Sequence, residues 1–244
     1  MRCLFAALFF SALLSGCASP PADPSGTWIN QAAIDAAVEG GNLREALLAY
    51  GPNLEWQIDS QRQQANFSNG FEHDEGTFAR SADGHLRVNF YAESQESLSL
   101  SNNQLVQAQS ATWPEQRFVR AAATPGPLAP PGSSFEQALY SAYLGGTWVI
   151  EEGVGEGGLV LFQADGSLQG LPGADRYALC LAGDCAAMSG EFDSLWLQLA
   201  DQGQSWIFER EGKQLRIFEA LNRAQIDEMP EYYKGELRWL LKRR

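Results

Sequence analysis

The chain has 244 residues, of which 30 are acidic and 17 basic, and its formal net charge is −13 at pH 7. An excess of acid this large disfavours general binding to nucleic acid or to anionic lipid headgroups, so we expect no nucleic-acid partner. The acids are spread along the chain rather than gathered in blocks, which indicates ordinary solvated faces.

The N-terminus has the parts of a secretory signal peptide. Met1-Arg2 is a short positive start, residues 4–14 form an apolar run, and Ser15-Gly16 are small residues before Cys17. This order is typical of a signal peptide over residues 1–16. Eleven apolar residues in a helix span only about half of the ~30 Å hydrocarbon core, so the segment is a poor transmembrane anchor.

The end of this segment, Leu14-Ser15-Gly16-Cys17, resembles the bacterial lipobox. The resemblance implies that the Cys17 thiol receives diacylglycerol, that the signal is removed, and that the new amine is acylated, for example with palmitate. Ala18 follows where an aspartate would favour retention in the inner membrane. The resemblance therefore implies an outer-membrane lipoprotein facing the periplasm, held firmly because two or three acyl chains bind far better than one. The alternative is a plain secretory signal with an incidental cysteine.

The first folded segment after the anchor reads as a small β domain over residues 26–120. Residues 17–25, with three prolines, form a tether. Capping signals predict helices over residues 31–39, after Asn30 and before Gly40-Gly41, and over residues 43–50, where Asn42 is followed three residues later by Glu45. Alternating apolar and polar residues predict strands over 54–58, 86–90 and 97–100, with hairpin turns at residues 83–84 (Asp-Gly) and 102–103 (Asn-Asn).

An uncharged stretch rich in proline, residues 121–134, reads as a linker to a second β domain over residues 135–244. Ser133 and Glu136 predict a capped helix over residues 135–144. Strands are expected over residues 195–199, 206–208, 215–218 and 237–241, with a turn at residues 165–166. The fold class is therefore mainly β, with two small antiparallel β-barrels or curved sheets and few short helices.

Both domains open on the same motif, Gly26-Thr27-Trp28 and Gly146-Thr147-Trp148, which indicates an internal duplication. A Gly-x-Trp on the first strand resembles lipocalin-like domains, where the tryptophan closes the barrel floor. The second domain is also similar to META-type envelope lipoprotein domains in its strand at residues 159–162, its turn at 165–166 and its glycines at 170 and 173. The resemblance implies barrels with a non-catalytic envelope role, and it marks Trp28 and Trp148 as candidate ligand-binding residues.

Two cysteines remain in the mature chain, Cys180 and Cys185. An oxidising compartment joins close pairs, so we expect a structural disulfide at the end of a hairpin. A redox-active pair is the alternative, but the spacing is not Cys-x-x-Cys and no helix start is predicted after the first cysteine.

We find no catalytic constellation and expect no metal and no cofactor. His73 lies in an acidic stretch that reads as a solvated turn between strands, since one imidazole is too few for a typical zinc site. His85 follows the turn at residues 83–84 and is expected to be exposed. Motifs for serine hydrolases, nucleotide binding and calcium loops are absent. A pair of carboxylates for hydrolysis cannot be singled out among the acids.

The aromatic residues at strand spacing, Trp56, Phe90, Trp196, Trp206 and Trp239, are expected in the core. The leading hypothesis is a non-catalytic binding or interaction module at the outer membrane. Its partner would be an envelope protein, peptidoglycan or a small hydrophobic ligand. The alternatives are a lipocalin-type carrier, which needs an open apolar cavity above Trp28 or Trp148, and an envelope hydrolase, which needs a carboxylate pair in a cleft.

Overall fold

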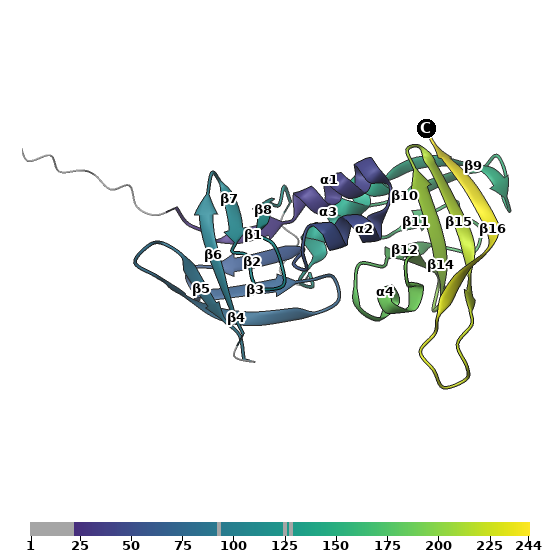
Figure 1. Cartoon of the computed structure of the whole chain (residues 1–244). Coiled ribbons are helices and arrows are strands. Elements are labelled where there is room, and N and C mark those ends of the chain that lie inside the picture. The colour runs from purple at the N-terminus through teal and green to yellow at the C-terminus, as the bar shows by residue number, and fades with distance from the viewer. Residues whose placement is uncertain (1–21, 92–93, 124–125, 127–128) are drawn as a thin grey trace, which may run out of the picture.

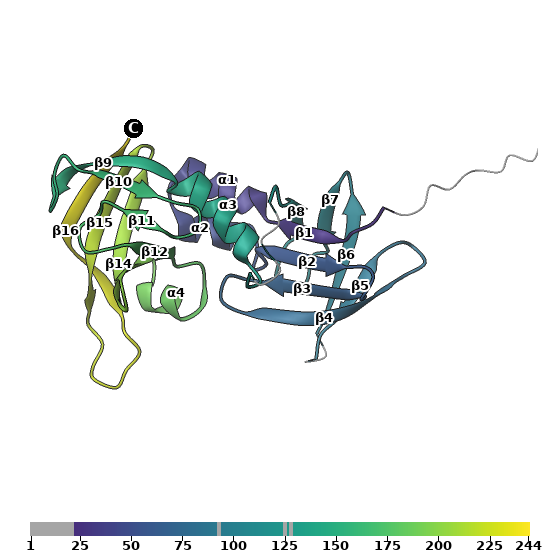
Figure 2. The ribbon, with the colours of Figure 1, turned by 180° about the vertical axis from the view of Figure 1, so that it is seen from behind.

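A computed structural model of the chain describes residues 22–91, 94–123, 126 and 129–244. The expected signal peptide and the lipidated Cys17 lie outside the described residues. The fold is mainly β, with two eight-stranded antiparallel sheets at the two ends of the molecule and short helices between them (Figures 1 and 2). Among the described residues, no helix is both long and apolar enough to cross a membrane.

The first sheet is a closed meander barrel, β1 to β8 in order, in which β8 pairs back with β1. Its strands are β1 (Gly26–Ile29), β2 (Glu55–Asp59), β3 (Gln64–Ser68), β4 (His73–Arg80), β5 (Leu86–Asn89), β6 (Gln95–Ser101), β7 (Gln104–Gln107) and β8 (Gln116–Arg120). The expected turns are confirmed, because Gly84, Asn102 and Asn103 all adopt positive φ. Such φ values are what tight hairpin turns require.

The second sheet has the same strand succession but stays open at one seam. It consists of β9 (Gly146–Gly153), β10 (Leu159–Phe162), β11 (Leu168–Gln169), β12 (Arg176–Leu179), β13 (Asp193–Leu199), β14 (Gln202–Glu211), β15 (Gln214–Asn222) and β16 (Tyr232–Arg243). The last strand β16 pairs with the first, β9, as β8 does with β1. Between β11 and β12 only an isolated bridge joins Ser167 to Arg176.

Three helices lie between the barrels: α1 (Gln31–Gly40), α2 (Leu43–Ala49) and α3 (Ser133–Tyr143) (Figure 1). The predicted caps of α1 and α2 are confirmed, since the Asn30 side chain accepts from the Ala33 N–H and Asn42 accepts from the Glu45 N–H. The predicted cap of α3 is wrong. Its N-cap is Gly132, in a left-handed conformation, and Ser133 lies inside the helix.

The apolar faces of α1 and α2 are buried in the core of the second barrel, although these helices follow the first strand of the first barrel. Ile34, Ala37, Leu43 and Leu47 belong to the same buried cluster as the second sheet and α3. The first barrel has its own smaller core around Trp28, Trp56, Val88, Leu98 and Phe118. The helical layer therefore couples the two barrels into one packed unit.

Candidate functional site

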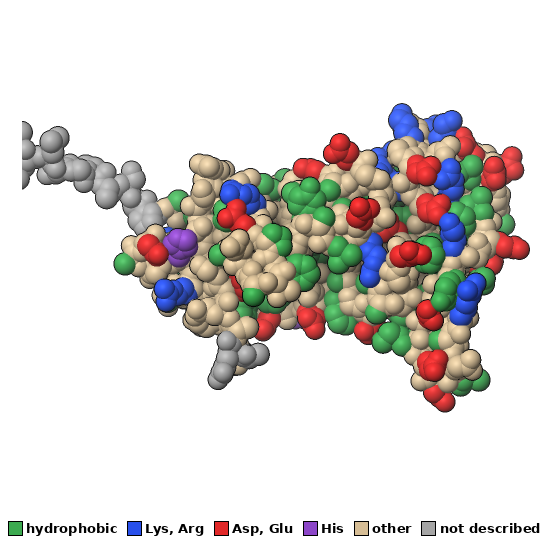
Figure 3. Space-filling model, in the orientation of Figure 1, with side chains coloured by type: hydrophobic (Ala, Val, Ile, Leu, Met, Phe, Trp, Pro, Cys, Tyr) green, Lys and Arg blue, Asp and Glu red, His purple; other side chains and the backbone are tan. Residues whose placement is uncertain are grey.

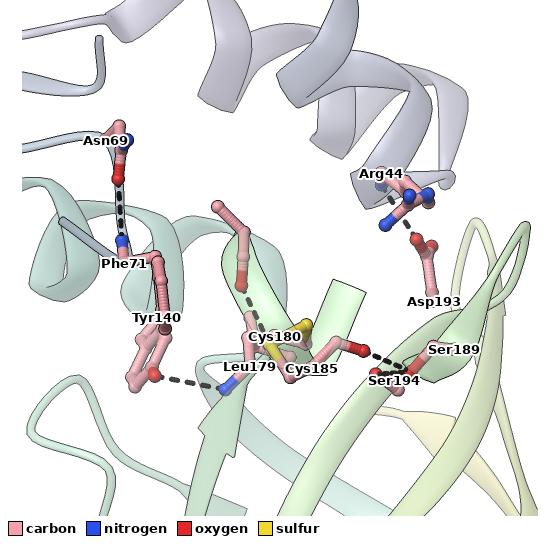
Figure 4. Close-up of a disulfide and its surroundings, with 11 residues drawn as sticks. Arg44, Asn69, Phe71, Tyr140, Leu179, Cys180, Cys185, Ser189, Asp193 and Ser194 are labelled. Atoms are coloured by element: carbon pink, nitrogen blue, oxygen red, sulfur yellow. Dashed lines mark hydrogen bonds between the residues drawn. A yellow bond between two sulfur atoms is a disulfide. The ribbon is translucent and has the colours of Figure 1, made fainter. Parts of the chain in front are cut away.

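Side-chain carboxylates fasten the helical layer to both barrels by accepting hydrogen bonds at helix starts. Glu55, at the start of β2 and 1% exposed, accepts from the N–H groups of Gly132 (3.1 Å) and Phe135 (2.9 Å) at the start of α3. Asp193, at the start of β13, accepts from the N–H groups of Leu43 and Arg44, both at 2.7 Å, at the start of α2 (Figure 4). Each barrel thus supplies a carboxylate that caps a helix from the other half of the sequence, and the helix dipole favours negative charge at that end.

The C-terminal end of α1 is held instead by side-chain donors. Arg210 of β14 donates to the Val38 carbonyl at 2.9 Å, and the Tyr143 hydroxyl of α3 donates to the Gly41 carbonyl. Gly41 adopts φ 79°, and a Cβ there would lie 2.1 Å from the Arg210 carbonyl oxygen. The position therefore requires glycine for its backbone conformation and for its close approach to β14.

Trp28 and Trp148 have matching surroundings. Trp28 and Trp148 are fully buried, and each donates from Nε1 to the carbonyl oxygen four residues earlier at 2.8 Å. The guanidinium of Arg120, at the end of β8, lies 4.2 Å from the Trp28 ring centroid, and that of Arg243, at the end of β16, lies 5.4 Å from the Trp148 ring. This repeated closure agrees with the duplication inferred from the two Gly-Thr-Trp motifs. The role of Trp28 and Trp148 as ligand contacts stays a prediction, because neither indole lines the four main surface cavities of the described residues.

Aromatic side chains pack in the interiors of both barrels, although a cavity opens among core residues at one end of the second. In the first, Trp56, Phe67 and Phe90 pack with ring centroids 5.3–6.2 Å apart. In the second, Phe162 packs against Trp148 and Tyr177 at 6.2 and 5.1 Å. Such aromatic clusters stabilise a closed core. Of the five aromatic residues expected in the core, Trp56, Phe90, Trp206 and Trp239 are buried, but Trp196 is 43% exposed, so that expectation is wrong. The strand alternation turns Leu195 and Leu197 inward and leaves Trp196 outside.

The predicted disulfide between Cys180 and Cys185 is present. It does not close a hairpin end, as expected, but ties the end of β12 to a short helix, α4 (Gly183–Ser189), which contains Cys185 (Figure 4). The loop that it closes packs against the first barrel. The Phe71 ring lies directly on Gly183, where a Cβ would be 2.1 Å from the ring, and Gly70 lies against Leu181.

These elements enclose a groove between the barrels, which we call the waist groove, with a volume of about 360 Å³. Its walls come from α2, the segment after it, the turns of the first barrel, and the disulfide loop with α4. The lining residues are Arg44, Leu47, Leu48, Gly51, Pro52, Leu54, Asn69, Trp113, Leu181, Ala182, Gly183, Ala186 and Ala187. Arg44 is the single charged residue among them. Hydrophobic side chains gather at this waist on the face shown in Figure 3.

Large apolar side chains at the waist groove are exposed to solvent. Leu48 is 61% exposed and Trp113 40%, and beside them Phe71 is 55% and Tyr50 41% exposed. The segment after α2 is held in place by buried amides: Gln116 Nε2 donates to the carbonyls of Tyr50 and Asn53 at 2.8 and 3.0 Å. The groove is therefore preformed, and its exposed apolar rim is unusual for a solvated surface.

Four acids lie near a separate cavity of about 270 Å³ at the start of α2: Glu191, Asp193, Glu209 and Glu211. Burial raises the pKa of the Asp193 carboxyl, against the opposing effect of its hydrogen bonds to the Arg44 and Leu43 amides. Both Asp193 oxygens are engaged by those amides. Glu209 pairs with Lys234 at 2.5 Å and Glu211 with Arg216 at 3.1 Å. These engagements assign Asp193 a capping role and leave no free carboxylate pair in its vicinity.

The two histidines are both exposed, and His73 begins β4 rather than lying in a turn as expected. Within the described ranges, no group of three or more His, Cys, Asp or Glu residues is placed to hold a metal ion.

Comparison with known proteins gives no relative. No family model, no curated protein and no solved structure matches this chain. Function is therefore inferred from the geometry and chemistry of the site itself.

Proposed function

We propose that the protein is a lipoprotein of the outer membrane, anchored through acylated Cys17 on the periplasmic face, and that its folded part is a non-catalytic binding module. The waist groove holds an apolar segment of another envelope protein. The observation that carries this proposal is the exposed apolar rim of the waist groove, where Leu48 is 61% and Trp113 40% exposed.

An exposed apolar patch at the surface favours a protein partner over a small molecule carried inside a barrel. The groove can accept several apolar side chains along α2 and the disulfide loop, and Trp113 at its edge is the residue type that most often dominates binding energy at interfaces. Arg44 lines the groove and forms no ion pair within the part of the chain that the structure describes. The segment that fits best carries a carboxylate next to its apolar residues.

The partner can be tested by photo-crosslinking in intact cells. A photoreactive phenylalanine analogue at Leu48 is expected to give one discrete adduct, which disappears when Ala187→Trp fills the groove. A matched probe at Leu159, a residue of β10 that is 49% exposed and outside the groove, is expected to give none. Equal adducts from both positions, or an Ala187→Trp variant that is folded and still crosslinks, would overturn the binding site.

The membrane anchor is tested separately. The wild-type chain is expected to incorporate radiolabelled palmitate and to remain with the outer-membrane fraction, whereas Cys17→Ser is expected to lose both. A Cys17→Ser variant that is processed normally and stays with the membrane would contradict the lipoprotein assignment, whatever the crosslinking result.

The carrier alternative is supported by a different observation. A cavity of about 490 Å³ lies at the end of the second barrel, lined by Trp206, Trp239, Leu197 and Leu199. This volume is within the range of small-molecule sites, ~300–1,000 Å³. Binding of a fatty acid that is lost in Trp239→Ala and kept in Ala187→Trp would favour a carrier.

A further inference from the structure

The segment just before β1 is bound to the first barrel. Trp28 Nε1 donates to the Pro24 carbonyl at 2.8 Å, and the Arg120 guanidinium donates to the carbonyls of Ser25 at 2.6 Å and Asp23 at 2.9 Å. All three carbonyl oxygens of this segment therefore accept from side chains of β1 and β8. A segment whose backbone acceptors are all engaged belongs to the fold rather than to a free tether.

The Asp23 side chain fastens the same segment to the turn after β2. Its carboxylate accepts from the Ser25 N–H at 3.0 Å, from the Ser25 hydroxyl at 2.8 Å and from the Ser60 hydroxyl at 2.7 Å. These bonds, that of the Ser25 N–H first, lower the pKa of Asp23 to about 2, so the carboxylate stays ionised at neutral pH. We give the name tether clamp to residues 23–25 together with Trp28, Ser60 and Arg120.

The second barrel uses the same pair of side chains to hold a different segment. Trp148 Nε1 donates to the Leu144 carbonyl at 2.8 Å, and Arg243 donates to the Gly145 carbonyl. The segment held there is the C-terminal end of α3, inside the helical layer. In the first barrel the corresponding segment is the one that leads back towards Cys17, so a device repeated in both halves fixes the chain on its way to the proposed anchor.

The tether clamp leaves little chain between the fold and that anchor. Five residues, 18–22, separate Cys17 from Asp23. Six Cα–Cα steps of a fully extended chain span at most about 20 Å, and this upper bound holds for any conformation of the segment. The end of the first barrel that carries the clamp therefore stays close to whatever surface holds Cys17.

The clamp lies at the end of the first barrel that is remote from the second. β1 begins there at Gly26 and leads at its other end into α1, which packs in the core of the second barrel (Figures 1 and 2). Their charged residues are Arg62 and Asp83, one of each sign, and they contain no large apolar side chain, for the three turns at this end. The strand register defines these turns, which we call the proximal rim: residues 60–63, 81–85 and 102–103.

From this placement we infer that the proximal rim faces the lipid headgroups and that the first barrel holds the waist groove away from the membrane. The inference rests on the proposed acylation of Cys17. Polar turns lie at the headgroups rather than in the hydrocarbon, where their groups would lose their hydrogen bonds to water. The eight residues of β4 connect the two ends of the barrel, which places them roughly 20 Å apart at ~3.3 Å per residue and a tilt of ~35–45°. The partner of the waist groove accordingly approaches from the aqueous side.

The test places one dye at each end of the first barrel. Ala82→Cys lies in the proximal rim and Ala111→Cys between β7 and β8 at the waist, and both alanines are exposed. Since Cys17 is acylated and Cys180 is joined to Cys185, the introduced thiol takes the dye. The mature lipoprotein is reconstituted in vesicles of phosphatidylethanolamine and phosphatidylglycerol with acceptor-labelled headgroups. Energy transfer is expected to be at least twofold higher from position 82 than from position 111.

Two pairs of variants test the cause of this difference. Ten glycine and serine residues inserted after Ala22 raise the maximal reach to about 55 Å and are expected to remove the difference, whereas the same ten residues appended after Arg244 should leave it unchanged. Arg120→Ala releases two carbonyls of the tether clamp and is expected to reduce the difference in folded protein. Arg117→Ala on the same strand is its control.

Equal transfer from both positions in vesicle-bound protein would overturn the inference and leave the anchor standing. Higher transfer from position 111 would also overturn it, because the waist groove would then face the membrane. A difference that survives the insertion after Ala22 would refute the short clamped tether as its cause. A chain that is not acylated would remove the anchor and the inference together, and the palmitate experiment with Cys17→Ser detects that outcome independently.

Discussion

Glu55 offers the sharpest test of how the two barrels are joined. Its carboxylate is 1% exposed and bonds the N–H groups of Gly132 and Phe135, and it also accepts from Gln57 Nε2 at 2.7 Å. Glu55→Ala leaves two helix-start donors without a partner inside the protein. Loss of an N-cap costs ~0.5–2 kcal/mol, and each hydrogen bond to a charged group contributes ~1.5–3 kcal/mol.

These contributions overlap, so we expect Glu55→Ala to lower the free energy of unfolding by about 3–5 kcal/mol. Glu55→Gln keeps one acceptor oxygen and is expected to cost about half as much. Because Glu55 links the first barrel to α3, whose apolar face is in the core of the second, both barrels should lose stability together. Wild type and variants are expected to unfold in one transition.

The measurement is urea unfolding followed by far-UV circular dichroism and by tryptophan fluorescence. Glu115→Ala is the control, since Glu115 is an exposed acid on the same barrel that pairs only with its neighbour Arg117, and a surface pair contributes ~0–1 kcal/mol. A cost for Glu55→Ala below about 1 kcal/mol would refute the capping argument. Two separate transitions, with only one shifted, would refute the shared helical layer.

Three further outcomes are expected. Burial, and after it the negative charge of Glu55, raises the pKa of Glu136, so the ionised form of Glu136 destabilises the fold. Glu136→Gln should therefore raise the thermal midpoint at pH 7, and this gain should fade as the pH falls towards the ordinary value of 4.5. A gain that does not change with pH would contradict this. The double variant Cys180→Ala, Cys185→Ala should lower the free energy of unfolding by about 2 kcal/mol, since the disulfide closes a short loop. It should also abolish crosslinking from Leu48. Retained crosslinking would show that the disulfide loop is no wall of the waist groove. Arg120→Ala removes the guanidinium that stacks on the Trp28 ring and donates to the Ser25 carbonyl at 2.6 Å. It should lower the free energy of unfolding by about 1–3 kcal/mol. The control Arg117→Ala should change that free energy little in the same urea assay.

Local chemistry explains which features the sequence could predict. The turns at residues 83–84, 102–103 and 165–166 depend on residues that accept positive φ, and the ends of α1 and α2 depend on Asn30, Gly41 and Asn42. Strand positions followed from alternation over a few residues. Each of these signals lies within about four positions of the feature that it specifies, so one sequence is enough to find it.

The waist groove could not be predicted because its walls come from distant segments. The walls are α2, the turn before Phe71, Trp113 and the disulfide loop, which are far apart in the sequence and adjacent only in the folded chain. Glu55 is the same case: in the alternating run Leu54-Glu-Trp-Gln-Ile58 it reads as a solvated residue, yet its partners are 77 and 80 residues away. No local pattern distinguishes a strand glutamate that caps a remote helix from one that faces water.

Trp196 shows how a local pattern can mislead about burial. An aromatic residue in an alternating strand is usually core, but the inward positions here belong to Leu195 and Leu197, so the register decides against Trp196. The signal that could have found it is the glycine at position 203, diagonal to Trp196 across the β13–β14 pair. A glycine within a strand weakens that strand. Gly203 leaves the space that the Trp196 ring occupies, since a Cβ there would lie 2.3 Å from the indole Nε1.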